Sequence, residues 1–305
     1  MVEVYNMAIL EFLFSILLSL LTAFGGLIGM FSTKDAAPED AIQLKYGAGK
    51  CEYLNIYLPE DTTEAKDVLF LVHGGAWIFN DESDFDENCR QAAKERGLVA
   101  VTMDYNKFQD GADCEDMLNE IDAAMNATKD KLTELGVPMT GNLILSGHSA
   151  GAQLSDLYAY TRYDTCPFKI CFVVSNCAPT DFETDATAKT TTMGKLATIT
   201  LSALAGKFVM AGATDEESRA LIDSVNPIKQ IDANCPPTIV VQGNADEMVP
   251  YQNGVDLYEA LKAAGIDTCM ITYEGAGHFL GAEFTEGNAA RAAAFDEYYA
   301  KYCVQ

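Results

Sequence analysis

The sequence has little basic charge and few histidines. Its 305 residues contain 20 Lys and Arg against 45 Asp and Glu, which gives a net charge of −25, and only three His. Basic patches supply most of the affinity of nucleic-acid-binding proteins, and basic segments attract proteins to anionic lipid. The composition therefore argues against nucleic acid as a partner and against electrostatic attachment to a membrane surface.

Closely spaced cysteines are also missing. The nine cysteines are irregularly spaced and include no Cys-x-x-Cys pair. A structural zinc site requires clustered Cys and His, so we expect no metal site. An odd number of cysteines fits a reduced compartment better than a disulfide-stabilised secreted scaffold, and most of them are expected to be buried apolar residues.

One long hydrophobic run stands out, at residues 12–31 (FLFSILLSLLTAFGGLIGMF). About twenty apolar residues can cross a bilayer as a helix. Glu3 and Glu11 precede the run instead of the Lys or Arg typical of signal peptides, although Ala23-Phe24-Gly25 resembles a cleavage site. Three interpretations of residues 1–31 stay open: a membrane anchor, a cleaved signal peptide, or a buried helix. The first two predict a secreted or membrane-anchored protein with its main domain outside the cytoplasm, and the third predicts a cytoplasmic protein.

Residues 32–40 are polar, contain Pro38 and are expected to be a linker. From residue 41 to 305, apolar runs typical of buried strands alternate with stretches of helical spacing. This alternation predicts one α/β domain, a mostly parallel central sheet flanked by helices. The expected strands are 53–59, 68–72, 98–103, 142–145, 170–174, 237–241 and 268–273. The expected helices include 87–96, 116–135, 255–263 and 288–302.

One stretch departs from the alternation. Residues 182–225 have no strand pattern and contain a long apolar, helix-like piece. Long connections within compact domains tend to be functional. We therefore expect a helical cap inserted between two strands, with an ordinary helical excursion as the alternative.

The expected strand 142–145 leads directly into Gly147-His148-Ser149-Ala150-Gly151. A Gly-x-Ser-x-Gly segment between a strand and a helix forms a sharp turn that exposes the serine hydroxyl. Ser149 is therefore the candidate nucleophile. The backbone N–H of Ala150 is the first candidate donor to an oxyanion.

A second glycine-rich segment, His73-Gly74-Gly75-Ala76-Trp77, follows the expected strand 68–72. Glycines let backbone N–H groups approach a developing negative charge, so Gly74 and Gly75 are the other candidate oxyanion donors. His73 is expected to hold this loop by hydrogen bonds. Trp77, the only tryptophan, is a candidate substrate-binding residue, with a packed core position as the alternative.

Two further candidates follow later strands. Asp246 comes shortly after strand 237–241, and His278 lies in a glycine-rich loop after strand 268–273. A serine nucleophile needs a base, His titrates near neutral pH, and an acid orients the imidazole. We expect the catalytic set Ser149, Asp246 and His278, with Glu247 as the competitor for the acid. His148 is a candidate substrate-binding residue beside the nucleophile.

At this point the chain resembles the α/β-hydrolase superfamily, and in particular the acetyl esterase/lipase group with an HGGxW loop, which includes feruloyl and acetylxylan-type esterases. It is also similar to kynurenine formamidases. The resemblance spans residues 41–302. It rests on Leu54-Asn55-Ile56-Tyr57-Leu58-Pro59, His73-Gly74-Gly75-Ala76-Trp77, Asp104-Tyr105, Gly147-His148-Ser149-Ala150-Gly151, Pro179-Thr180-Asp181, Ser224-Val225-Asn226-Pro227, Gln242-Gly243-Asn244-Ala245-Asp246 and Gly277-His278.

Three features depart from that group. Asn106 follows Asp-Tyr where the group usually has Arg, Gln242 stands where His is common, and the cap is longer. None of these touches the three catalytic candidates. The cap and Gln242 bear on the choice of substrate.

The resemblance implies a serine carboxylic ester hydrolase that forms an acyl-enzyme on small or short-chain acyl esters, with acetylated carbohydrate as one candidate substrate. No metal or organic cofactor is implied, and the partner is a small-molecule ester. One alternative is an amide or formamide hydrolase, or a peptidase of the same fold. Another is a non-catalytic binding module tethered to a membrane by the N-terminal segment. Oligomeric state is left open.

Overall fold

The computed structural model describes residues 38–182, 202–206 and 215–304. In this part of the chain, eight strands form one sheet. In spatial order they are β1 (Ile42–Lys45), β2 (Tyr53–Tyr57), β4 (Val99–Met103), β3 (Lys66–Val72), β5 (Met139–His148), β6 (Lys169–Asn176), β7 (Thr238–Gly243) and β8 (Thr268–Tyr273).

The sheet is mostly parallel. β1 pairs antiparallel with β2, and β2 pairs antiparallel with β4, whereas all pairs from β4 to β8 are parallel. The carboxyl ends of the parallel strands therefore lie along one edge. Open α/β sheets hold their ligands outside that edge, and the predicted site residues follow β3, β5, β7 and β8.

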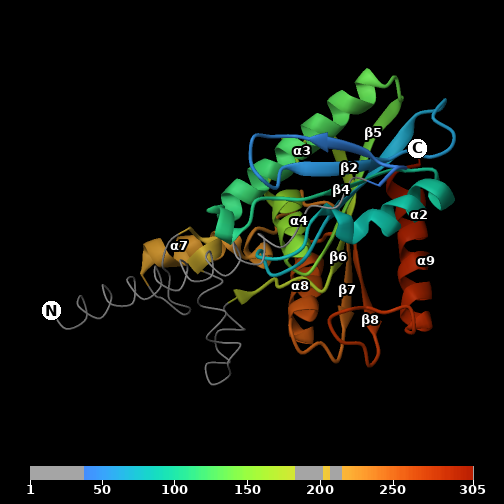
Figure 1. Ribbon diagram of the computed structural model, residues 1–305. Coiled ribbons are helices and arrows are strands. Elements are labelled where there is room, and N and C mark those ends of the chain that lie inside the picture. Colours follow the sequence, from blue (N-terminus) through green and yellow to red (C-terminus); the bar gives the residue numbers. More distant parts are fainter. Residues whose placement is uncertain (1–37, 183–201, 207–214, 305) are drawn as a thin grey trace.

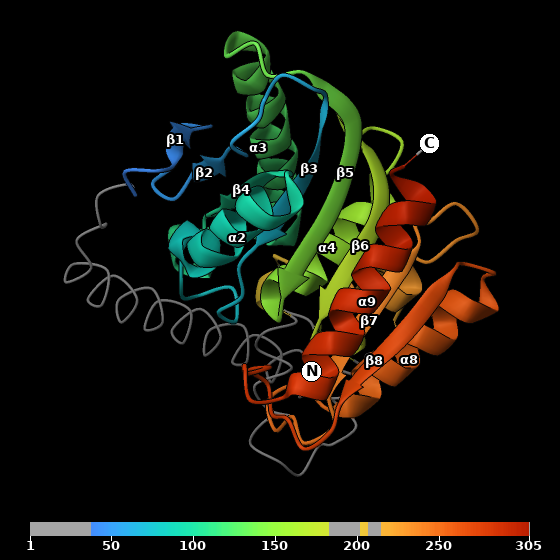
Figure 2. The same cartoon turned by 90° about the vertical axis from the view of Figure 1, so that its right-hand side faces the viewer.

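Helices cover both faces of the sheet (Figures 1 and 2). One face carries α2 (Asp86–Arg96) and α9 (Thr285–Tyr302). The other carries α3 (Cys114–Glu134), α4 (Ala150–Thr161) and α8 (Tyr251–Ala263). The described residues also include α7 (Glu216–Val225), the helical residues 202–204 and the 3-10 helices η1 (Glu82–Phe85), η2 (Phe108–Asp110) and η3 (Pro227–Lys229).

Two hydrophobic clusters lie on the two sides of the sheet, and β3 contributes to both. Val68, Phe70 and Val72 belong to the cluster under α3, α4 and α8, whereas Leu69 and Leu71 belong to the cluster under α2 and α9. Successive strand residues point to opposite faces. A continuous apolar strand is therefore buried on both faces, as the sequence predicts for the centre of a parallel sheet.

Helix α3 begins two residues earlier than its apolar spacing indicates. The Asp113 side chain accepts from the backbone N–H of Asp116, and the Asp116 side chain accepts from that of Asp113. This reciprocal capping satisfies two helix-terminal N–H groups that would otherwise lack acceptors. The cap residue fixes the start at Cys114 rather than at 116.

Three expected segments lie wholly or mostly outside the described residues: the hydrophobic segment 1–31, the linker 32–40 and the cap 182–225. The described ends of the cap meet, because the backbone N–H of Phe182 donates to Oδ1 of Asn226 at 2.9 Å. Among the described helices, none combines the length and the apolar character that a bilayer-spanning segment needs.

Candidate active site

Ser149 occupies a strained turn between β5 and α4. Its φ is 56° and its ψ is −122°, a conformation that non-glycine residues rarely adopt. A Cβ atom at Gly147 would lie 2.3 Å from the Gly151 carbonyl oxygen, and one at Gly151 would lie 2.1 Å from that of Val72. Both flanking positions therefore require glycine. The Ser149 N–H donates to the Asn176 carbonyl oxygen at 2.9 Å, which fixes the turn to β6.

Asp246 and His278 are brought together. His278 Nδ1 lies 2.7 Å from Asp246 Oδ2, and both side chains are almost fully buried. Asp246 also accepts from the N–H groups of Met248 and Val249. Burial alone would raise the pKa of Asp246, but the hydrogen bonds from His278 and Val249 outweigh burial and hold that pKa below its usual value. The carboxylate is therefore ionised and can only accept, so His278 Nδ1 carries the proton.

Gln242 fills the position where the resembling group commonly has His. Its Nε2 donates to Asp246 Oδ2 at 3.0 Å and to the Val249 carbonyl oxygen at 3.1 Å. The Gln242 amide thus links the Asp246 carboxylate to the backbone of Val249 and stabilises the turn 243–249, called the acid turn below. Glu247, the competing candidate acid, is exposed, and it is Asp246 that contacts His278.

The acid turn and the histidine loop pack directly on each other. Ala245 N–H donates to the Ala276 carbonyl oxygen at 2.9 Å. A Cβ atom at Gly243 would lie 2.6 Å from the Gly277 carbonyl oxygen. The close approach of these backbones explains the glycine at position 243 and fixes the separation of Asp246 and His278.

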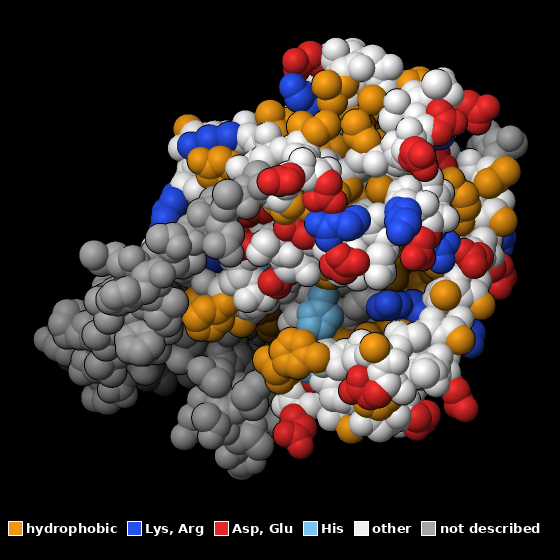
Figure 3. All heavy atoms as spheres, turned by 45° about the vertical axis from the view of Figure 1, so that its right-hand side comes forward, with side chains coloured by type: hydrophobic (Ala, Val, Ile, Leu, Met, Phe, Trp, Pro, Cys, Tyr) orange, Lys and Arg blue, Asp and Glu red, His pale blue; other side chains and the backbone are white. Residues whose placement is uncertain are grey.

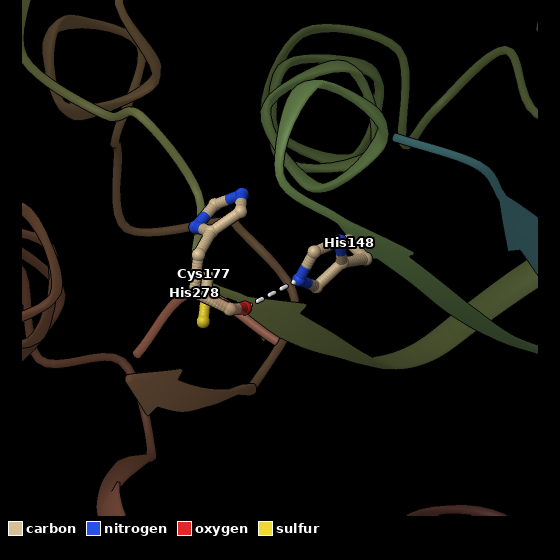
Figure 4. Close-up of side chains that lie close together, drawn as sticks. All are labelled: His148, Cys177 and His278. Carbon is tan, nitrogen blue, oxygen red and sulfur yellow. Dashed lines mark hydrogen bonds between the residues drawn. The ribbon is translucent and has the colours of Figure 1, made fainter. Parts of the chain in front are cut away.

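His148 contacts the same loop (Figure 4). Its Nε2 lies 2.9 Å from the backbone carbonyl oxygen of His278, and the two rings are 4.8 Å apart between centroids. A carbonyl oxygen only accepts, so His148 Nε2 carries a proton. Burial lowers the pKa of His148, which keeps the ring neutral at neutral pH. This contact between the nucleophile turn and the His278 loop is not visible in the sequence.

Cys177 completes a group of three potential metal ligands with His148 and His278, drawn in Figure 4. It is the one such group in the described residues, with ligand atoms within 4.8 Å of one another. One nitrogen of each ring is already bonded, to Asp246 or to a carbonyl oxygen. Burial raises the pKa of the Cys177 thiol to about 12, whereas metals bind the thiolate. These three side chains are therefore better described as two hydrogen-bonded imidazoles beside a neutral thiol than as a metal centre.

The glycine loop after β3 runs along the nucleophile turn. A Cβ atom at Gly74 would lie 2.8 Å from the His148 carbonyl oxygen and 3.2 Å from Ser149 Cβ. Gly75 has a φ of 109°, which favours glycine. In the described part of the chain, the N–H groups of Gly74, Gly75 and Ala150 have no acceptor. These are the three predicted oxyanion donors.

His73 holds this loop, as expected. Its Nδ1 lies 2.6 Å from the Gly74 carbonyl oxygen, and its Nε2 lies 3.0 Å from Asp104 Oδ1. The ring is fully buried and stacks on Tyr105 at 4.4 Å between centroids. Asp104 also accepts from the buried ammonium group of Lys107.

The Ser149 hydroxyl makes no hydrogen bond to any described residue. The nucleophile turn is nevertheless linked to the loop of the candidate base, because His148 precedes Ser149 and its side chain bonds the backbone carbonyl oxygen of His278. Catalytic hydrogen bonds are often long before substrate binds. His278 Nε2 is the ring nitrogen that Asp246 leaves free.

Trp77 lies in the core. It is 4% exposed, its Nε1 donates to Gln153 Oε1 at 3.1 Å, and it contacts Phe108 and Phe182 at 6.0 Å between centroids. This is the packed position left open as the alternative. Contact of Trp77 or His148 with substrate stays a prediction.

Exposed hydrophobic side chains come from all three loops of the site. Phe79 follows the glycine loop, Met248 lies in the acid turn and Phe279 follows His278; their exposed fractions are 50%, 49% and 74%. Figure 3 shows a histidine side chain in a hollow of this face, next to hydrophobic side chains. No sequence motif indicates this apolar rim, because its three residues come from separate loops.

A family model, BD-FAE, matches residues 54–261. The chain belongs to the BD-FAE family. This is an esterase family of the α/β-hydrolase fold, so the fold class and the hydrolase class expected from the sequence are confirmed. The match spans β2 to α8 and includes the Ser149 turn and Asp246, whereas His278 lies beyond it.

Two curated relatives of this BD-FAE protein have different activities. A probable isoprenylcysteine alpha-carbonyl methylesterase of Arabidopsis thaliana is 24% identical over 256 residues, covering 76% of this chain and 49% of the relative. The chain thus spans about half the length of that protein. The kynurenine formamidase of Danio rerio is 24% identical over 248 residues, covering 78% of this chain and 74% of the relative.

A solved structure shares the fold. Inhibitor-bound esterase B from Lactobacillus rhamnosis superposes with a TM-score of 0.67 at 20% identity, covering 88% of this chain and 90% of that one. At this level of identity the likeness concerns the fold alone.

Proposed function

We propose that this BD-FAE protein is a serine carboxylic ester hydrolase for short acyl esters, with Ser149, His278 and Asp246 as its catalytic triad. The observation that carries the proposal is the 2.7 Å contact between His278 Nδ1 and Asp246 Oδ2, next to the strained Ser149 turn. Strained backbone of this kind clusters at functional sites. An acid that fixes the imidazole tautomer is what a serine nucleophile requires.

The proposed reaction follows from these proton positions. Because His278 Nδ1–H donates to Asp246, its Nε2 lone pair is free to take the proton of Ser149 Oγ as that oxygen attacks the ester carbonyl. The imidazolium is stabilised by the Asp246 carboxylate and then protonates the leaving alcohol. Water repeats the cycle on the acyl-enzyme and releases the carboxylic acid.

The oxyanion of the tetrahedral intermediate is proposed to lie between the N–H groups of Gly74, Gly75 and Ala150. The close approach of Gly74 to Ser149 and the missing acceptors of these N–H groups in the described residues support this position. Preorganised donors stabilise such a charge because they need no reorientation during the reaction.

The rim formed by Phe79, Met248 and Phe279 supports an apolar, uncharged acyl or alcohol group at the entrance. We propose short acyl chains as the substrate class and acetylated carbohydrate as a candidate natural substrate. The charge-free run 12–31 supports a secreted or membrane-anchored enzyme, which fractionation of cells expressing the full chain would test.

A second candidate is a formamide hydrolase, which is favoured by the formamidase of Danio rerio among the relatives. The same triad would attack an N-formyl carbonyl, and His278 would protonate a leaving amine instead of an alcohol. The difference between the two candidates therefore lies in the leaving-group pocket and not in the triad.

The test is hydrolysis of p-nitrophenyl acetate, butyrate and octanoate, with formanilide as the amide probe, by the full chain and by Ser149→Ala. We expect the highest kcat/KM on acetate or butyrate and a loss of at least about 10⁴-fold in the variant. Formanilide cleavage without ester cleavage would favour the second candidate. A folded protein that cleaves neither and does not react with a fluorophosphonate would contradict both.

A further inference from the structure

Helices α2 and α9 lie on the face of the sheet opposite α4 (Figure 2). A cavity of about 300 Å³ is lined by residues of both helices. Its floor is made by side chains of β3, β5 and β6. α2 follows the carboxyl end of β3, and α9 follows the loop of His278. The first turns of both helices, with Asn88 and Asn288, therefore border the cavity at the catalytic edge of the sheet.

Arg291 lines this cavity and differs from every other arginine. The chain has five arginines. Arg90, Arg96, Arg162 and Arg219 each form an ion pair with Asp or Glu. Arg291 has no carboxylate partner in the described part of the chain, and its one hydrogen bond is a long one, 3.5 Å to Asn176 Oδ1. In a protein with 45 acidic residues, a half-buried guanidinium without an acid is an unsatisfied anion site.

The charges facing the cavity leave a positive excess. Arg96 also lines it, but Asp296 neutralises that side chain. Glu95 is the one acidic lining residue, and it lies in the last turn of α2, remote from the catalytic edge. At physiological ionic strength, salt screens the interaction between charges that lie more than about 8 Å apart. The net charge of −25, which is spread over the whole chain, therefore acts only weakly on the cavity. The unpaired Arg291 therefore determines which charge this cavity accepts.

Arg291 is also joined to the catalytic edge through Asn176. Asn176 Oδ1 accepts the hydrogen bond from Arg291, and Asn176 Nδ2 donates to the Gly147 carbonyl oxygen at 2.7 Å. The Asn176 carbonyl oxygen accepts the Ser149 N–H. One residue thus separates the cavity from the nucleophile turn.

We propose that the cavity between α2 and α9 binds a carboxylate group, with Arg291 as its anchor. The guanidinium offers paired N–H donors that match a carboxylate, and the amides of Asn88, Gln91 and Asn288 supply further polar contacts. The volume suits a small organic acid or the acidic end of an ester. For the acidic end of an ester, this inference rests on the proposed ester hydrolase; for a free organic acid, it is independent of that function.

The first experiment compares p-nitrophenyl hemiglutarate with p-nitrophenyl valerate, in which a methyl group replaces the carboxylate. If the ester carries the carboxylate, wild-type kcat/KM favours the hemiglutarate. Arg291→Met lowers that preference by about 10- to 100-fold, the usual effect of losing a charge-assisted bond, and Arg291→Lys restores part of it. A merely structural Arg291 would slow both esters equally. Arg90→Met, which removes a paired arginine of α2, leaves the preference unchanged.

The second experiment measures glutarate binding to the full-length Ser149→Ala protein by calorimetry, and its effect on valerate hydrolysis by the wild type. If the ligand is a free acid, glutarate binds to the Ser149→Ala protein and Arg291→Met abolishes that binding. Glutarate then also changes the rate of valerate hydrolysis, and the wild type shows no preference for the hemiglutarate ester. The proposal is overturned if the ester preference does not depend on Arg291 and glutarate binding is absent or unaffected by Arg291→Met. If no ester is cleaved, the proposed function fails and the calorimetry alone decides the cavity.

Discussion

His148 Nε2 donates to the backbone carbonyl oxygen of His278 at 2.9 Å. The residue before the proposed nucleophile therefore holds the loop of the proposed base. The bond links β5 to the loop after β8, two segments 130 positions apart in the sequence. It fixes the distance between Ser149 and His278 without occupying the ring nitrogen that accepts the proton.

Removing this bond should slow the reaction without unfolding the protein. His148→Phe keeps a flat ring but loses the donor, and one neutral hydrogen bond is worth about 1 kcal/mol, or about fivefold in rate. We expect kcat/KM for p-nitrophenyl acetate to fall by about that factor. His148→Gln, which keeps an N–H donor, should lose less. Equal losses in both variants would contradict a positioning role.

Gly74→Ala should be far more damaging than a similar change nearby. The new Cβ would lie 2.8 Å from the His148 carbonyl oxygen and would push the loop away from Ser149. Loss of one oxyanion donor typically costs about 10²- to 10³-fold in kcat, and we expect a loss of this size. The matched control is Gly277→Ala, whose Cβ would meet only the Ala245 carbonyl oxygen at 3.9 Å. Retained activity in Gly74→Ala would place the oxyanion elsewhere.

The fold was largely predictable because its central strands are buried on both faces. Apolar runs such as 68–72 and 98–103 can be read directly from the sequence, and they match the buried strands β3 and β4 closely. β1 was missed: it has four residues, its side chains are partly exposed, and it pairs only with β2. Short edge strands have no strong hydrophobic pattern because little of their surface is buried.

The order of the motifs predicted the members of the proposed site, since each motif follows the end of a strand. The contacts among them were not predictable in the same way. Gln242 and Asp246 are close in the sequence, but the Gln242 amide also donates to the Val249 carbonyl oxygen. That second contact depends on how the turn after Asp246 folds. Arg291 and Asn176 are 115 positions apart. Such pairs depend on how helices pack on the sheet, which hydrophobic periodicity does not specify.

The buried pair of Asp104 and Lys107 should be strongly coupled. Both side chains are about 5% exposed and directly bonded. Burial opposes the charge of each, but their attraction, together with His73, holds the pKa of Asp104 below and that of Lys107 above the usual value. Removing one partner of a buried pair strands the other charge, at a cost of about 3–5 kcal/mol.

We therefore expect Lys107→Met to lower the free energy of unfolding by several kcal/mol, and the double variant Asp104→Asn/Lys107→Met to lose less than the sum of the single variants. Urea unfolding of the four proteins in a double-mutant cycle measures the coupling. Additive effects would mean that Asp104 is held by His73 and Tyr105 alone.

Asp156 on α4 should make stability depend on pH. The residue is fully buried, its Oδ2 accepts from Ser175 Oγ at 2.7 Å, and its Oδ1 has no partner in the described residues. Burial raises the pKa of Asp156 to about 8, and the bond from Ser175 lowers it too little to compensate. In the unfolded chain the pKa is about 3.9. The folded state thus binds the proton more tightly.

Neutral Asp156 stabilises the folded state most at low pH. The stability contributed by neutral Asp156 is complete below about pH 4 and is lost as the pH rises from about 4 to about 8, by up to about 1.4 kcal/mol per pH unit. Asp156→Asn is neutral throughout and keeps an acceptor for Ser175. We expect the free energy of unfolding of Asp156→Asn, relative to that of the wild type, to increase as the pH rises over this range. The matched control is the exposed Asp130→Asn, whose free energy of unfolding should change with pH as that of the wild type does. Parallel curves for Asp156→Asn as well would mean that the folded protein holds this carboxylate ionised.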